Sequence, residues 1–240
     1  MLEMNRLYNM DCMEGMRELP DKFFDLAVVD VPYGIGEDGS KNKERSKLAV
    51  AKNYKAFHGN DLQPPECEYF TELMRVSKNQ IIWGANHFIS RIPVDSHCWI
   101  VWDKENGETD FADCELAWTS FHTAVRRFKY RWHGMLQEDM KNKEIRIHPT
   151  QKPIALYSWI LSKYAKRGDK ILDTHAGSAS SLIACYRAGL DFIGFEIDTE
   201  YYTAANMRLT VEMEQIRINF DELQEEQEEY TQSSIFEGGG

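Results

Sequence analysis

Residues 170–197 read KILDTHAGSASSLIACYRAGLDFIGFEI, and this stretch decides the expected fold. An apolar run over 170–172 predicts a buried strand, residues 178–188 predict a helix closed by Gly189, and residues 192–197 predict a second strand. Two strands joined by a helix are typical of a parallel βαβ unit. Small residues in the turn after the first strand allow a ligand to approach the backbone, and the helix start that follows favours negative charge.

The same alternation of strands and helices runs along most of the chain. Apolar runs predict strands at 24–29, 80–83 and 98–102, and a short strand is expected at 5–10. Helices are expected after Asp11, which has Glu14 at a capping-box spacing, over 64–76, from Pro153 to Gly168, and from Thr199 onward. We therefore expect one α/β domain over 1–240, Rossmann-like, with a mostly parallel twisted sheet and helices on both faces.

Three sub-regions depart from the alternation. Residues 34–63 begin with glycines and continue with lysines and arginines, which favours a mobile basic loop. Residues 104–147 separate two apparent halves of the sheet and contain RFKYRW at 127–132, where basic and aromatic residues alternate. On a strand the aromatic side chains would share one face and the basic ones the other. Residues 211–240 are expected to form an acidic helix and tail.

Composition and charge narrow the class of protein. The 240 residues are 42% hydrophobic and 12% aromatic, enough for a sizeable core, and no run of about 18 apolar residues indicates a membrane span. The five cysteines are scattered without a CxxC pair, so we expect a reducing cytoplasm, no disulfide framework and no metal site. The net charge of −11 is concentrated in eight acids between residues 211 and 230, while 34–60 and 120–147 are basic.

The first candidate site follows the apolar run 24–29 and consists of Asp30, Val31, Pro32 and Tyr33. In open α/β sheets, ligands bind beyond the carboxyl ends of the strands. A carboxylate, a backbone carbonyl and an aromatic ring suit an exocyclic amine on a flat base, because two acceptors on its N–H bonds release the nitrogen lone pair. The alternative interpretation is an ordinary strand-to-turn junction.

Two further motifs each allow a functional and a purely structural interpretation. DTHAGSAS at 173–180 joins a strand to a helix, and Glu196 follows about 20 residues later, where an acid commonly accepts bonds from ribose hydroxyls. A glycine-containing turn with a coincidental acid is the alternative. HPTQKP at 148–153 is either a simple helix start or a polar loop that reaches a cofactor or a nucleic-acid backbone.

Together these motifs resemble one family. DVPY is similar to the DPPY motif, DTHAGSAS is similar to DPFxGSGT, and HPTQKP matches a signature that precedes it. They resemble the S-adenosylmethionine-dependent DNA amino-methyltransferases, in the β-type order in which the catalytic tetrapeptide precedes the target-recognition stretch and the cofactor loop. The resemblance spans about residues 5–210, and it implies a methyltransferase fold with a permuted motif order and a small target-recognition insertion.

The resemblance assigns roles to residues of this chain. The tetrapeptide Asp30, Val31, Pro32 and Tyr33 is implied to be catalytic, with Val31 acting through its carbonyl. The residues implied to bind S-adenosylmethionine are Asp11, Thr150, Lys152, Asp173, His175, Gly177, Ser178 and Glu196. His175 and Ala179 depart from the family pattern, where phenylalanine and glycine stand, and the second change matters only if the loop requires a positive φ.

The implied reaction is direct methyl transfer to a base that has been flipped out of duplex DNA. Asp at the head of the tetrapeptide favours adenine N6 by analogy with the family, and cytosine N4 is the alternative. The residues expected to contact DNA are Lys41, Lys43, Arg45, Arg126, Arg127, Lys129 and Arg131. The alternatives for these two basic stretches are a surface loop and an edge strand that basic residues protect against aggregation.

Three rival functions stay open at this point. They are a degenerate methyltransferase that binds nucleic acid beside an active one, an RNA methyltransferase, and a protein-amide methyltransferase. A nicotinamide-dependent dehydrogenase is disfavoured because no GxGxxG follows a strand, and carbon-5 methylation is disfavoured because no Pro-Cys pair occurs. Duplex DNA is the expected partner, and a cognate restriction nuclease or a second copy of the chain are further candidates. An apolar seam at 209, 213, 216, 220 and 223 either packs on the domain or joins two protomers.

Overall fold

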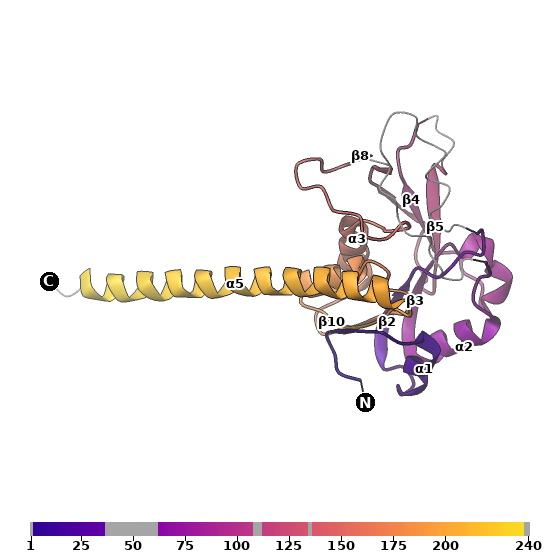
Figure 1. Ribbon diagram of the computed structural model, residues 1–240, viewed down its shortest axis with the longest axis horizontal. Coiled ribbons are helices and arrows are strands. Elements are labelled where there is room, and N and C mark those ends of the chain that lie inside the picture. The colour runs from indigo at the N-terminus through magenta and orange to yellow at the C-terminus, as the bar shows by residue number, and fades with distance from the viewer. Residues whose placement is uncertain (1, 37–61, 108–111, 134–135, 238–240) are drawn as a thin grey trace.

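The computed structural model describes residues 2–36, 62–107, 112–133 and 136–237, with the side chains of the last helix described as far as Ile218. The strands are β1 (Arg6–Tyr8), β2 (Phe24–Val29), β3 (Ser77–Trp83), β4 (Trp99–Asp103), β5 (Cys114–Thr119), β6 (Arg126–Lys129), β7 (Trp132–His133), β8 (Leu136–Gln137), β9 (Lys170–Asp173) and β10 (Asp191–Phe195). The α-helices are α1 (Cys12–Arg17), α2 (Cys67–Val76), α3 (Ile154–Tyr164), α4 (Ser180–Arg187) and α5 (Thr199–Glu237), and two 3₁₀ turns, η2 (Ala85–His87) and η3 (Ile89–Arg91), follow β3 (Figure 1).

A twisted sheet of eight strands organises the described chain, in the order β1-β10-β9-β2-β3-β5-β4-β6. The five strands from β1 to β3 pair in parallel, whereas β5 runs antiparallel to both β3 and β4. The expected Rossmann-like fold with a mostly parallel sheet is confirmed. A separate two-stranded ribbon, β7-β8, lies outside this sheet.

Two hydrophobic clusters, one on each face, hold the sheet between helices. Along β2, Leu26 and Val28 join the cluster that contains α3 and α4, while Ala27 and Val29 join the cluster that contains α2. This alternation follows from the two-residue period of a strand, and it explains why 24–29 reads as a continuous apolar run. The helices labelled in Figure 1 lie accordingly, with α1 and α2 on one side of the sheet and α3 on the other.

The expected elements are present, and several of them differ in extent or role. The helix expected from Pro153 to Gly168 ends at Tyr164, and the strand expected at 80–83 begins at Ser77. The helix predicted from Pro64 begins at Cys67, because Glu66 is its N-cap and both prolines lie in the extended segment before it. Residues 104–147 contribute β5 and β6 to the main sheet, so a large part of this stretch is framework. The basic–aromatic alternation is retained there: Phe128 and Tyr130 stack at 5.7 Å and pack against the core, while Arg127 and Lys129 are exposed.

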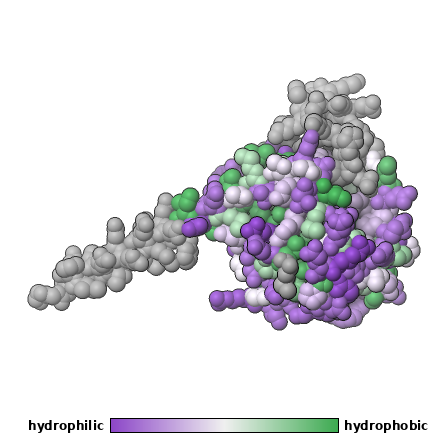
Figure 2. All heavy atoms as spheres, turned by 60° about the horizontal axis from the view of Figure 1, so that its bottom comes forward, coloured by the Kyte–Doolittle hydropathy of each residue, from purple (hydrophilic) through white to green (hydrophobic). Residues whose placement is uncertain are grey.

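Helix α5 packs on the body at its start and extends beyond it (Figure 1). Leu209 is buried and Met213 packs against the core, so the beginning of the predicted apolar seam lies on the domain itself; positions 220 and 223 have no described side chains. Three apolar side chains of α5, Met207, Val211 and Ile218, are exposed, and Figure 2 shows hydrophobic surface where the helix leaves the body. No helix in the described ranges is long and apolar enough to cross a membrane.

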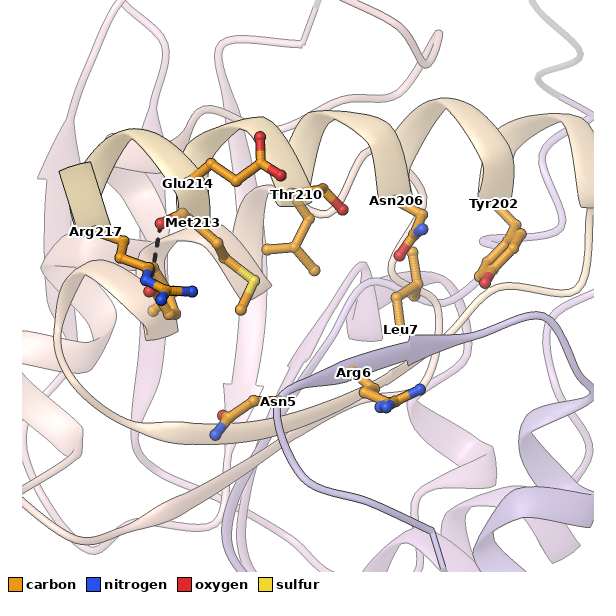
Figure 3. A pocket seen from close by; sticks show the side chains of 11 residues that line it. Asn5, Arg6, Leu7, Tyr202, Asn206, Thr210, Met213, Glu214 and Arg217 are labelled. Carbon is orange, nitrogen blue, oxygen red and sulfur yellow. Dashed lines mark hydrogen bonds between the residues drawn. The ribbon is translucent and has the colours of Figure 1, made fainter.

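A pocket of about 440 Å³ lies between the edge strand β1 and helix α5 (Figure 3). Arg6 and Leu7 line it from the strand, Tyr186 from α4, and Asn206 and Thr210 from α5. It contains none of the residues that the sequence analysis singled out as functional. The site is therefore built from the strand ends and not from this pocket.

Candidate active site

The parallel strands place three predicted carboxylates at one edge of the sheet. Asp30 directly follows β2, Asp173 is the last residue of β9, and Glu196 directly follows β10. The register pairs Ala27 with Leu172 and Gly194 with Asp173, so the strands end at nearly the same level. This is the edge at which ligands bind in open α/β sheets.

Asp30 lies in a cluster of charged and phenolic groups that is mostly shielded from solvent. Lys152 Nζ is 2.6 Å from Asp30 Oδ2 and 3.0 Å from Glu115 Oε2, and it donates to the Tyr33 hydroxyl at 3.0 Å. The Tyr33 hydroxyl donates to Asp30 Oδ1 at 2.9 Å, and Lys104 Nζ contacts Glu115 Oε1. Because charges removed from water are costly unless they are paired, the two carboxylates balance the two ammonium groups of this cluster.

The pKa values of the two carboxyl groups in the cluster are shifted in opposite directions. Burial raises the pKa of Asp30 above its usual value, although the nearby Lys152 opposes that shift. The pKa of Glu115 is about 2, because Lys152 and Lys104 together outweigh its burial. The pKa of Lys152 is raised because Asp30 and Glu115 outweigh the burial of its ammonium group. Lys152 is therefore an ammonium group held between two carboxylates.

Two contacts hold the ring of Tyr33. It stacks on His87 with ring centroids 5.2 Å apart and an angle of 15° between the planes. The backbone of Gly84, whose φ is +69°, also lies close to this ring, because a Cβ added there would overlap it. Gly84 thus meets two demands at once, a left-handed conformation and a close approach to an aromatic ring.

The loop after β9 is held by its own carboxylates. Asp173 accepts the His175 backbone N–H at 3.0 Å and the Ser181 hydroxyl, and burial raises its pKa to about 7. Glu196 accepts the Gly177 backbone N–H at 2.9 Å, which ties the loop to the end of β10. Burial also lowers the pKa of His175 to about 4, so this imidazole is neutral at physiological pH.

The backbone of the loop requires positive φ at two positions. Gly177 has φ +51°, and Ala179, the N-cap of α4, has φ 60° and ψ 22°. The change from glycine to Ala179 matters if the loop requires a positive φ, and it does: an alanine occupies a left-handed position that glycine takes without strain. His175, the other departure, donates or accepts a bond at 2.9 Å with Thr174, whose hydroxyl is 2.6 Å from that of Tyr69.

The HPTQKP segment reaches both halves of the site. The His148 ring packs against Tyr201 with centroids 4.3 Å apart, and its Nδ1 is 3.0 Å from the Thr150 hydroxyl. His148 also lies near Gly177, because a Cβ built there would be 3.8 Å from its ring. Lys152 continues into the Asp30 cluster, and Pro153 is the N-cap of α3 as the helix-start interpretation expects.

Asp11 caps a helix. Its carboxylate accepts the backbone N–H groups of Met13 at 2.7 Å and Glu14 at 3.3 Å, which confirms the capping prediction. The pKa of Cys12 is raised chiefly by burial of its thiol and secondly by the negative charge of Asp11. The same charge opposes the effect of burial, which lowers the pKa of His175. Asp11 therefore lies close enough to the loop after β9 to act on it electrostatically.

Ser178 and Ser180 lie at the turn into α4. Both side chains are buried, and their hydroxyl oxygens are 3.0 Å apart. Arg208 of α5 donates to the Ser178 carbonyl at 2.8 Å and to the Ser180 hydroxyl at 2.9 Å. The predicted cofactor residue Ser178 is thus fixed at the start of the helix by its neighbours and by α5.

The basic residues expected to contact DNA fall into two groups. Arg126, Arg127, Lys129 and Arg131 are exposed on and just after β6, which is an edge strand of the sheet. Lys41, Lys43 and Arg45 lie outside the described residues. In the described ranges no group of three or more His, Cys, Asp or Glu side chains is arranged to hold a metal ion.

Glu115 and Lys104 were not identified from the sequence. Glu115 lies on β5, and its partners come from the segment after β4 and from just before α3, so no local pattern connects them. The available signal was a single acid inside the apolar strand CELAWT, since a charged residue in such a strand needs a partner. Ser181 was also missed, because it reads as an ordinary first-turn residue of α4.

The comparison with known proteins agrees with this geometry. The profile of a family described as DNA methylase, of the N6/N4 methyltransferase type, matches residues 76–207. The chain belongs to this family. The type II methyltransferase M2.MboI of Moraxella bovis is 25% identical over 236 residues, which cover 84% of this chain and 86% of the relative. The resemblance drawn from the three motifs is thereby confirmed.

Two solved structures share the fold of this DNA methylase. A complex of M1.HpyAVI with S-adenosylmethionine has a TM-score of 0.54 and 23% identity, covering 85% of this chain and 98% of that one. The PvuII DNA methyltransferase, which is cytosine-N4-specific, has a TM-score of 0.52 and 11% identity, covering 88% and 91%. Both likenesses concern the arrangement of the strands and helices.

S-adenosylmethionine is the cofactor of the family, and the residues at the strand ends fit it. The loop at Gly177 leaves its backbone open, because a Cβ there would meet nothing closer than 3.8 Å. The Glu196 carboxylate, held by the backbone N–H groups of Gly177 and Asp198, keeps lone pairs that suit ribose hydroxyls. The neighbouring carboxylates of Asp173 and Asp30 suit the positive charges on the methionine part of the cofactor.

Proposed function

We propose that this DNA methylase transfers a methyl group to N6 of adenine in duplex DNA. The observation that carries the proposal is Asp30, a half-buried carboxylate at the end of β2, with the hydroxyl of Tyr33 at 2.9 Å and the open loop after β9 on the neighbouring strand. The choice of adenine rests on an Asp at the head of the tetrapeptide, as the family resemblance implies. S-adenosylmethionine supplies the methyl group and the positive charge that makes it transferable.

The residues of the tetrapeptide provide the acceptors that an aromatic amine needs. Asp30 accepts one N–H bond of the amine, and the Val31 carbonyl accepts the other, so the nitrogen lone pair is directed toward the methyl group. The nitrogen would form its new bond to the methyl carbon as the carbon–sulfur bond breaks and a neutral thioether leaves, and Asp30 would accept the proton that the methylated amine then loses. Acceptors that the fold holds close to the amine are a large source of rate in such a transfer.

Tyr33 and the basic edge serve the target base and its DNA. The base must leave the duplex, which costs a few kcal/mol of stacking, and the half-buried Tyr33 ring offers a flat surface in place of the lost neighbours. The exposed arginines and lysines of the β6 region supply sequence-independent contacts to phosphates, which offset part of that cost.

One measurement tests the reaction and its base together. The purified protein is incubated with unmethylated genomic DNA and S-adenosylmethionine, and the DNA is digested to nucleosides for mass spectrometry. We expect N6-methyladenine, reduced roughly a hundredfold or more by Asp30→Ala. The variant should fold, because Lys152 keeps Glu115 as a partner at 3.0 Å. Asp95→Ala, at an exposed position, is the matched control.

The other outcomes have definite meanings. N4-methylcytosine would retain the mechanism and change the base, an alternative favoured by the fold likeness to the cytosine-N4-specific PvuII enzyme. Methylation of RNA or of a protein amide in a parallel substrate panel would show that the substrate is RNA or protein and not DNA. Binding of S-adenosylmethionine without any methylated product would favour the degenerate-partner hypothesis.

A second measurement tests the basic edge. Arg126→Ala with Arg127→Ala should weaken DNA binding at low salt. The slope of log affinity against log salt should become shallower by about 0.9 for each phosphate that the variant no longer neutralises. If the arginines only protect the edge strand β6 from aggregation, the slope stays unchanged and the variant becomes less soluble.

A further inference from the structure

The Asp30 carboxylate is not ready to accept an amine as it stands. Its Oδ2 is 2.6 Å from Lys152 Nζ, and its Oδ1 accepts the Tyr33 hydroxyl at 2.9 Å. A carboxylate that is neutralised by an ammonium group at this distance is a weaker acceptor for a neutral N–H donor. If Asp30 directs the amine, the two donors must loosen their hold on it.

Glu115 is the second carboxylate that these same two donors already contact. Its Oε2 lies 3.0 Å from Lys152 Nζ and 3.3 Å from the Tyr33 hydroxyl. Its Oε1 contacts Lys104, which anchors the side chain from the other side. Both donors therefore reach Glu115 with a small shift and without leaving the cluster.

We propose that Glu115 is a positioning residue that takes over Lys152 and the Tyr33 hydroxyl when the target amine arrives, so that Asp30 receives the amine as a free anion. The inference rests on the proposed function and concerns the same site. The exchange keeps the net charge of the cluster unchanged, because two carboxylates and two ammonium groups are present before and after it. Glu115 itself contacts neither the base nor the cofactor.

Removing the charge of Glu115 should keep Asp30 paired with Lys152 and so slow methyl transfer. In Glu115→Gln the amide oxygen still accepts a hydrogen bond, but Asp30 becomes the one carboxylate of the cluster and holds Lys152 more tightly. We expect the rate of methyl transfer at saturating DNA and cofactor to fall roughly tenfold or more, while the affinity for S-adenosylmethionine stays within about twofold. Glu115→Asp keeps the charge and should recover part of the rate.

Lys104 provides a test of opposite sign. It competes with Lys152 for Glu115, so Lys104→Met should give Glu115 a stronger hold on Lys152. We expect a rate at least equal to that of the wild-type enzyme, and no further change when Lys104→Met is added to Glu115→Gln. If the cluster merely supports the fold, both single variants lower the rate together with the melting temperature.

The experiment measures single-turnover methylation of unmethylated genomic DNA, cofactor binding by calorimetry, and the melting temperature. It includes Glu115→Gln, Glu115→Asp, Lys104→Met, the double variant, and Glu68→Gln, which removes an exposed ion pair with Arg17 as the control. The inference is supported if Glu115→Gln is slow with normal cofactor affinity and Lys104→Met is at least as fast as the wild-type enzyme.

If Glu115→Gln does not fold, Lys104→Met alone tests the inference: an equal or higher rate supports it, and a lower rate contradicts it. An active wild-type enzyme with an equally active Glu115→Gln overturns this inference alone, whereas an inactive wild-type enzyme overturns the proposed function and this inference with it.

Discussion

Ala179 offers a direct measure of the strain in the cofactor loop. Its φ of 60° and ψ of 22° are left-handed, and its side chain is completely buried. For a residue with a Cβ this conformation costs about 1–2 kcal/mol, whereas glycine adopts it freely. Ala179→Gly therefore relieves the strain while keeping the loop in place.

Two further effects oppose this gain. The substitution removes a buried methyl group worth about 0.8 kcal/mol, and it gives the unfolded chain extra freedom worth about 0.4–1 kcal/mol. The three contributions nearly cancel, so we expect a free energy of unfolding within about 0.5 kcal/mol of wild type.

Ala176→Gly is the matched control in the same loop. Ala176 is also buried, at 7% exposed, but its φ is not positive, so glycine there relieves no strain. The variant lacks the methyl group and gains unfolded-state freedom, and we expect its free energy of unfolding to fall by about 1.5 kcal/mol. Urea unfolding followed by tryptophan fluorescence compares the variants. Equal decreases at both positions would show that Ala179 carries no strain and would refute the reasoning.

Two further predictions concern the strand ends. Gly84→Ala should slow methylation strongly, because the added Cβ would displace the Tyr33 ring. Gly107→Ala is the control and should stay active, because Gly107 has a similar φ of +66° and a Cβ there would meet nothing within 4 Å. Equal rates for the two variants in an activity assay would argue against a fixed Tyr33. Burial raises the pKa of Asp173 to about 7, so the folded state binds more protons than the unfolded state between about pH 4 and pH 7, and this carboxyl lowers stability as the pH rises through that window. Asp173→Asn, which preserves the shape of the side chain, should flatten that decline in unfolding experiments, and an unchanged slope would contradict the shift.

The sequence predicted the elements whose signal is local. The strand β2 was placed at its observed bounds because residues 26–29 are buried on both faces and therefore apolar, with Phe24 before them and Asp25 as the one polar residue. The cap at Asp11 was predicted because an aspartate just before a helix accepts the free backbone N–H groups of the first turn, which is a local interaction. The start of α2 was misplaced because Pro64 and Pro65 satisfy the rule for a first turn as well as the rule for an extended segment.

Long-range pairing is what the sequence did not reveal. The stretch 104–147 reads as an insertion, yet β5 inserts between β3 and β4, and β6 then pairs with β4. The insertion of β5 depends on antiparallel register between Trp83 and Ala117 and between Ile100 and Ala117, which no periodicity within 104–147 specifies. The consequence reaches the site, because this pairing carries Glu115 beside Asp30.

The buried charges carry a signal that the motifs do not. Glu115 lies on the mainly apolar strand β5, and the Lys152 side chain is buried, so an unpaired charge at either position would be costly. Each therefore implies an opposite charge from elsewhere in the chain, and Asp30, after its own apolar strand, makes the same demand. Three such demands in one α/β domain are satisfied most simply by a single cluster at the carboxyl edge of the sheet, where Lys152 lies within 3.0 Å of both carboxylates. Charge balance among buried residues thus predicts contacts that motif and periodicity leave undetermined.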